Sequence, residues 1–266
     1  MKTKFLLICL LLSFSTLCLF SQEDDSIKKV IKGLEIKTFQ PGEYLKYVGK
    51  LGMIKSGEAV MTVDMAMNGD RAIFHYKAAA YTAGVAKTLY KLRDIYESYV
   101  DIETGLPLKS IRNIQESNYT NYDEVLFFRK KGELLSIKKG QKSAPPNVMD
   151  ILSMFYHMRR YAMENLQPKQ ILTYVLYFED KIKHFQVRYI GLETIKTKWG
   201  KVRCKKFIPV VEKGKNIEED DAIKIWITDD ENRVPVLVKF DLAIGNIKAE
   251  LDEYANLKSE IQFIEK

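Results

Sequence analysis

One stretch of the chain repeats its apolar residues at helical spacing. The repeat runs from Val148 to Leu166, and its main apolar face consists of Val148, Ile151, Leu152, Phe155, Met158 and Ala162. Two prolines precede this stretch, Asn147 is a favourable N-cap, and Asp150 is placed to complete a capping box. We therefore expect a central helix over residues 148–166.

On both sides of this stretch, apolar and polar residues alternate in short runs that are separated by turn residues. Glu58–Met67 is one such run, and Asn68-Gly69 after it predicts a hairpin with a type I′ turn. About a dozen such runs follow one another at hairpin-like spacing. The pattern predicts a mainly β protein, in which a curved antiparallel sheet, an incomplete barrel or a sandwich packs on the central helix.

Two turn segments resemble each other in sequence. Asp101–Leu108 aligns without gaps to Asp229–Val236, and each lies between two predicted strands with a proline just after the turn. One explanation is that restricted turn chemistry has produced the same hairpin twice. The other is that two related β halves flank the helix. Both explanations support the same architecture.

The two ends of the chain differ in character from the middle. Residues 1–21 have a short basic start and an apolar run, which is the layout of a secretory signal peptide. An uncleaved membrane anchor is the alternative. We expect residues 22–41 to be a loose segment, residues 42–251 to form one β-rich domain, and residues 252–266 to be a polar tail. Export to the periplasm follows, with no transmembrane segment after cleavage.

Composition limits the partners and the chemistry. The net charge of +7 includes Lys2 and Lys4 of the presumed signal, and the remaining basic residues are scattered singly among acids, so nucleic acid is not expected. Cys204 is the cysteine that remains outside residues 1–21, which leaves no intramolecular disulfide, and we expect it to be a small buried side chain. The histidines lack metal-binding spacing, so we expect no metal and no cofactor.

The helix has a narrow polar stripe, which is the strongest candidate for a functional site. Its members with a possible role in binding are Asp150, His157 and Arg160, at spacings that place them on one face. As a functional feature, the stripe would line a cleft between helix and sheet. As a structural feature, it is the solvated side of an amphipathic helix. No nucleophile elbow, phosphate loop or other catalytic motif is present in the sequence, so we do not expect an enzyme.

Several runs together resemble the DUF3108 family, whose members are exported bacterial proteins of unknown function. The resemblance rests on Pro41–Tyr47, Lys55–Ala59, Asp150–Tyr156 with Arg159, and Ile225–Val236. It implies an envelope-associated β protein with no catalytic residues. The residues of these runs to which the resemblance assigns a structural role are Gly42, Glu43, Tyr47, Gly57, Trp226, Asp230, Arg233 and Pro235. The hairpin at Asp101–Pro107 is also similar to hairpins of LolA/LolB-type lipoprotein carriers, which are open half-barrels closed by a helix.

Three functions remain open on this basis. The first is a monomeric, non-enzymatic envelope protein that binds a lipid or another amphipathic ligand, or an envelope protein. The second is an envelope hydrolase or isomerase that uses Asp150, His157 and Arg160. The third is a structural assembly partner with an exposed apolar patch or edge strand.

Overall fold

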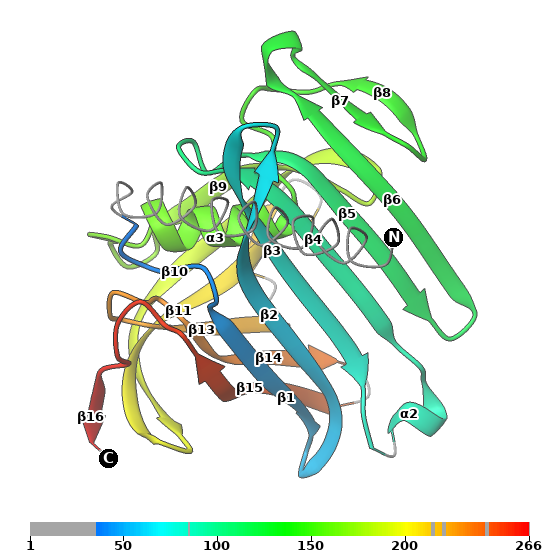
Figure 1. The fold of residues 1–266 in the computed structure, drawn as a ribbon. Coiled ribbons are helices and arrows are strands. Elements are labelled where there is room, and N and C mark those ends of the chain that lie inside the picture. Colours follow the sequence, from blue (N-terminus) through cyan, green and yellow to red (C-terminus); the bar gives the residue numbers. More distant parts are fainter. Residues whose placement is uncertain (1–35, 85, 214–215, 220–221, 243–244, 266) are drawn as a thin grey trace, which may run out of the picture.

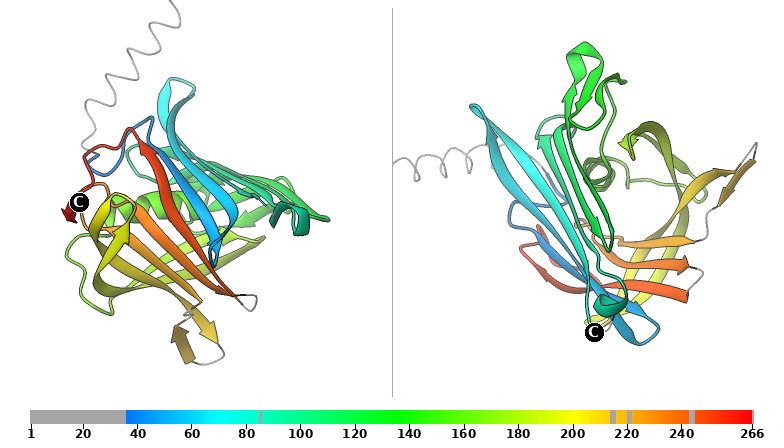
Figure 2. Two further views of the ribbon diagram at one scale, coloured as in Figure 1. Left: turned by 90° about the horizontal axis from the view of Figure 1, so that it is seen from below. Right: turned by 90° about the vertical axis from the view of Figure 1, so that its right-hand side faces the viewer.

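A computed structural model describes residues 36–265 except 85, 214–215, 220–221 and 243–244, and the expected signal peptide, residues 1–21, therefore lies outside the described residues. Within the described part, one antiparallel sheet of 16 strands forms almost the whole molecule. The sheet curves into an incomplete barrel with a helix inside it (Figures 1 and 2). The expected fold class is confirmed. The expected count of about a dozen strands was low, because three short strands, Gly140–Ser143, Asn216–Glu219 and Phe263–Glu265, were not predicted.

The first half of the chain is a meander in which each strand pairs with the next. Its strands are β1 (Tyr44–Leu51), β2 (Ile54–Asn68), β3 (Arg71–Thr82), β4 (Arg93–Asp101), β5 (Pro107–Glu116), β6 (Tyr119–Phe128), β7 (Glu133–Ser136) and β8 (Gly140–Ser143). Two single-turn helices interrupt it, α2 (Ala86–Leu89) and η1 (Arg129–Lys131). The β2–β3 hairpin confirms the expected strand pair, but its central residues are Gly69 and Asp70. Only Gly69 has a positive φ, of 61°, so the predicted type I′ turn over Asn68-Gly69 is wrong.

The second half repeats this plan after the helix. Its strands are β9 (Ile171–Phe178), β10 (Lys181–Thr197), β11 (Gly200–Lys213), β12 (Asn216–Glu219), β13 (Ile223–Thr228), β14 (Pro235–Leu242), β15 (Gly245–Ala255) and β16 (Phe263–Glu265). The order across the sheet is β8-β7-β6-β5-β4-β3-β2-β1-β15-β14-β13-β11-β10-β9, and β12 and β16 also pair with β11. The two halves therefore join where β1 pairs with β15, and the ends of the sheet are β8 and β9.

The central helix α3 (Ile151–Tyr161) begins later and ends earlier than residues 148–166. Its N-cap is Asp150, not Asn147, and Ser153 completes the capping box. The reason lies in Met149, which is extended and bonds to β9: its N–H donates to the Val175 carbonyl at 2.9 Å, and its carbonyl accepts from the Tyr177 N–H at 2.9 Å. Tertiary pairing with β9 therefore prevents the first predicted turn from being helical.

The two similar turn segments occupy equivalent places. Pro107 begins β5 and Pro235 begins β14. In both cases the register of the strand pairing shifts next to the proline. Both turns also hold α3: the Ile102 carbonyl accepts from Arg160 at 2.6 Å, and the Asn232 carbonyl accepts from Arg159 at 2.8 Å. The resemblance in sequence thus corresponds to two hairpins that hold the helix from opposite halves of the sheet.

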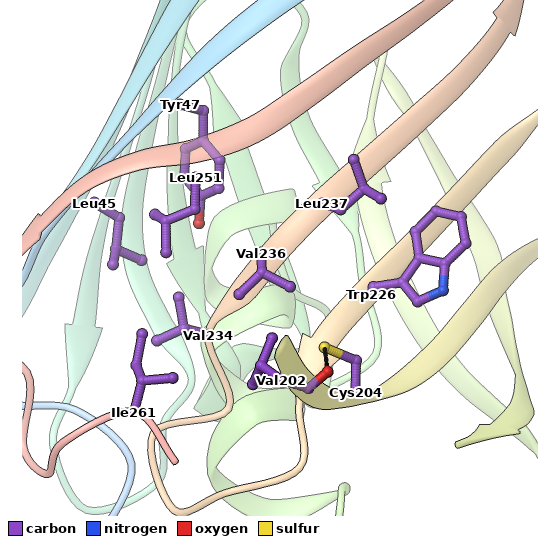
Figure 3. Packing of buried hydrophobic residues seen from close by; sticks show 10 residues of the cluster. All are labelled: Leu45, Tyr47, Val202, Cys204, Trp226, Val234, Val236, Leu237, Leu251 and Ile261. Atoms are coloured by element: carbon purple, nitrogen blue, oxygen red, sulfur yellow. Dashed lines mark hydrogen bonds between the residues drawn. The ribbon is translucent and has the colours of Figure 1, made fainter. Parts of the chain in front are cut away.

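The core lies on both sides of the helix and includes Phe39 and Ile261, near the two ends of the described residues. Figure 3 shows the cluster around Leu45, Trp226 and Cys204, in which the thiol is fully buried, as expected. Burial raises the pKa of the Cys204 thiol to about 12, so this cysteine is protonated at neutral pH. Among the described residues, no helix is long and apolar enough to cross a membrane.

Two expectations for the chain ends are wrong. Residues 36–41 are not loose, because Phe39 is 1% exposed and packs against α3 and β3. Residues 252–266 are not simply a polar tail, because β15 continues to Ala255, Ile261 is buried and β16 pairs with β11. The first segment places Ile36 and Phe39 in the core, and the second places Ile261 there.

Candidate binding site

A buried ion pair links the helix to the first strand. The guanidinium of Arg159 donates to both carboxylate oxygens of Glu43, at 2.7 and 2.9 Å, and both side chains are fully buried. The same guanidinium donates to the Asn232 carbonyl at 2.8 Å, and its face lies over the Phe39 ring. The Glu43 carboxylate keeps the pKa of Arg159 above its usual value despite burial. Both charges are therefore retained inside the core.

Four of the eight residues to which the family resemblance assigns a structural role, Glu43, Tyr47, Arg233 and Pro235, meet around this ion pair. The Tyr47 hydroxyl donates to the Pro235 carbonyl at 3.0 Å, and Arg233 donates to the Arg159 carbonyl at 2.6 Å. Arg233 also pairs with Glu164 at 2.6 Å. These contacts join β1, α3 and the turn between β13 and β14. Their role is to fix the helix inside the sheet.

The other residues of that set also have structural contacts. Gly42 has a φ of +86° and donates to the Val63 carbonyl, and a Cβ at Gly57 would lie 3.0 Å from the Tyr81 carbonyl oxygen. Asp230 orders its turn by accepting from the backbone N–H groups of Asn232 and Arg233. The Trp226 indole donates to Glu193 at 2.9 Å. These residues build the scaffold.

The three candidates on the helix have separate partners. Asp150 is buried, accepts from the N–H groups of Leu152 and Ser153, and accepts from the Ser98 hydroxyl at 2.7 Å. Burial raises its pKa, and these hydrogen bonds partly offset the effect. Arg160 donates to the Ile102 carbonyl, and its guanidinium lies over Tyr161. His157 is half-buried against the Tyr161 ring, at 4.7 Å between centroids. The stripe therefore faces the sheet, and Asp150 lies apart from the other two.

His157 should make stability depend on pH. Burial, and then the positive charge of Arg160, lower its pKa below 6.5, while the Gly105 backbone partly offsets them. As pH falls through 6.5 the unfolded chain binds the proton first, so stability decreases from pH 7 towards pH 5. We expect His157→Gln to reduce that decrease, as measured by denaturant unfolding at both pH values. The exposed His184→Gln is the control. An equal pH dependence in both variants would contradict this role.

The helix-bearing face of the sheet continues beyond the helix as an apolar surface. One row of directly opposed residues crosses five strands, namely Ile225, Val238, Ala249, Gly49 and Gly57. Neighbouring rows add two groups of residues. In one, Ala59 lies opposite Ala80. In the other, Ile247 lies between Phe240 and Leu51 and is paired with both. All of these residues are half-buried. We call them the apolar face.

The apolar face belongs to the same side of the sheet as α3. Ile225 packs against the cluster formed by helix methionines and β9–β11, and Ala78, next to Ala80 on the same face, packs against the cluster that includes Tyr156. Our sequence reasoning missed this surface. The signal that could have identified it is the period-two recurrence of small residues in Gly57-Glu58-Ala59 and Ala78-Ala79-Ala80.

A groove lies next to this face, between β4–β6 and the β9–β10 turn. Two adjoining pockets form it, with empty volumes of about 460 and 780 Å³ that include space open to solvent. Both are lined by Tyr96, Arg112, Phe178, Glu179 and Asp180. Asp150 lines the smaller of the two pockets, whereas neither His157 nor Arg160 lines either pocket of the groove. Within the described residues, no group of three or more His, Cys, Asp or Glu side chains could hold a metal ion.

The sheet and its internal helix place the protein in the class of mainly β proteins with a curved, incompletely closed antiparallel sheet. A model of the family described as "Protein of unknown function (DUF3108)" matches residues 44–252, and the chain belongs to this family. A search of curated proteins finds no match.

One of the similar solved structures shows the same kind of fold. A β-barrel-like protein of the domain of unknown function DUF1849 from Brucella abortus is 8% identical, with a TM-score of 0.51 over 81% of this chain and 97% of that one. A protein with a YmcC-like fold from Bacteroides fragilis is 14% identical, with a TM-score of 0.35 over 83% and 98% of the two chains. At these identities the first likeness concerns the fold alone.

Proposed function

We propose that this protein is an exported, non-enzymatic binding protein that holds an apolar or amphipathic ligand of the cell envelope on the apolar face. The observation that carries the proposal is the in-register row of small and aliphatic side chains beside α3, which is only half-buried. Monomeric proteins rarely leave a contiguous apolar surface without a partner. Glycine and alanine at its centre leave space for a ligand chain against the backbone.

The polar groups near α3 favour binding over catalysis. Asp150 is occupied by the helix cap and Ser98, and Arg160 by the Ile102 carbonyl. A hydrolase or isomerase would need these groups to converge with His157 on a substrate. Their separate contacts instead favour a role in holding the helix over the apolar face.

A pair of adjacent substitutions tests the proposal. Ala80 belongs to the apolar face, whereas Ala79 points to the other side of β3, because side chains alternate along a strand. We expect delipidated protein to bind a fluorescent fatty acid saturably, and Ala80→Trp to weaken this binding at least 10-fold by filling the space beside Ala59. Ala79→Trp is the control and should bind like the wild type.

Two results would reject the proposal. One is the absence of saturable binding by the delipidated wild type. The other is an equal affinity of the two tryptophan variants, provided that thermal unfolding shows both to be folded.

A further inference from the structure

Strand β6 has an open edge beside the groove. Its partner β7 pairs only with residues 125–128, and the last backbone bond on this side is from the Ile137 N–H to the Glu124 carbonyl, at 2.9 Å. Backbone groups of alternate residues point to the same side, so the N–H and C=O groups of Tyr122 and Thr120 also point outward. Within the described part of the chain, no backbone group pairs with them. The edge is visible in Figure 1, where β6 extends well beyond β7.

The groove along this edge is acidic and aromatic. The acids that line it are Glu97, Glu116, Asp123, Asp150, Glu179 and Asp180, and the cations that line it are Arg112 and Lys138; Lys77 also pairs with Glu97, Lys139 with Asp180 and Lys183 with Glu179. Its rings are Tyr96, Tyr119, Tyr177 and Phe178. Aromatic faces and carboxylates are the groups that attract ammonium and guanidinium side chains.

Several polar groups of the groove lack a partner. The Nε of Arg112 is buried without a hydrogen bond among the described residues, and its guanidinium lies over the Phe178 ring at 5.5 Å. The hydroxyl of Tyr177, a residue that is 6% exposed, also has no hydrogen-bond partner of good geometry among the described residues. Leaving such groups unsatisfied is costly, and both residues belong to the lining of the groove.

We propose that an extended, basic peptide segment of a partner protein docks here, adding as a strand to the open edge of β6. Its main chain would pair with Thr120 and Tyr122, which is the usual mode of β-strand addition. Its basic side chains on one face would meet the acids of the groove, including Glu179 at the β9–β10 turn. The site is separate from the apolar face, so this inference does not depend on the proposed fatty ligand.

Two proline variants separate edge pairing from general effects. Thr120 in β6 and Thr173 in β9 are both exposed threonines on strands at an open edge. In β9 the backbone groups of Val175 and Tyr177 point outward, since they bond to Met149. Alternate residues point to the same side, so the Thr173 N–H, two residues before Val175, also points outward. Proline is tolerated where an N–H faces solvent, but it blocks the addition of a strand. Thr120→Pro therefore removes the proposed pairing, and Thr173→Pro is its matched control.

The probe is a fluorescein-labelled decapeptide of alternating lysine and valine, followed by anisotropy with the full chain. We expect saturable binding, at least 10-fold weaker binding of an alternating glutamate–valine twin, and at least 10-fold weaker binding to Thr120→Pro. Thr173→Pro should bind like the wild type. The exposed substitution Glu179→Lys should weaken binding about 5-fold without touching the edge. Absent binding, equal affinity for the two peptides, or equal affinity of the two proline variants would overturn the proposal.

Discussion

Replacing Arg159 by methionine is expected to lower the free energy of unfolding by about 3–5 kcal/mol, because it leaves the Glu43 carboxylate buried without a counter-charge. The substitution also removes the donors to the Asn232 and Thr38 carbonyls. Chemical denaturation followed by tryptophan fluorescence would measure the change. The double variant Glu43→Leu/Arg159→Met should recover much of the loss, because it removes both charges from the core and leaves apolar side chains in their place.

An exposed ion pair on β1, the strand that follows Glu43, supplies the control. Lys50 lies 2.7 Å from Glu250 across β1 and β15, and both side chains are more than 40% exposed. Solvent screens such pairs, so Lys50→Met should move the denaturation midpoint little. If Arg159→Met had as small an effect as Lys50→Met, or if the double variant were no more stable than Arg159→Met, the buried pair would not be what fixes α3.

The fold was predictable where local patterns determine it. The alternation in β2 and β3 and the glycine between them were sufficient to predict that hairpin, although the turn is shifted by one residue. The joining of the two halves of the sheet was not predictable. It depends on β1 pairing with β15, for example Tyr44 opposite Ala255, and no local pattern encodes a register between segments so far apart.

The site was less predictable than the fold. The helix stripe was the visible polar pattern, yet Asp150 serves as a cap and Arg160 binds a turn. The apolar face consists of small, aliphatic and aromatic residues from six strands, which are unremarkable in each strand and form a surface only in register. The groove depends on the β9–β10 turn lying against β4–β6, which is a tertiary contact. A pattern within one segment cannot reveal a site that is assembled from many.

Replacing Phe39 by alanine should also be severe, lowering the free energy of unfolding by about 3–5 kcal/mol. Its ring makes edge contacts with Phe74, Tyr76 and Tyr156 at centroid distances of 5.2–5.8 Å, and its face lies under the Arg159 guanidinium. Truncation would leave a cavity between α3 and β3 in which neighbouring aromatic rings cannot relax fully. Denaturant unfolding is the measurement.

Phe128, which is 39% exposed on β6, is the matched control, because its truncation to alanine removes much less buried surface. Because Phe39 and Arg159 are in contact, their effects should not add: Phe39→Ala combined with Arg159→Met should cost less than the sum of the two. Equal effects of Phe39→Ala and Phe128→Ala would contradict the assignment of the segment before β1 to the core. Additive effects would instead show that the ring and the ion pair stabilise α3 independently.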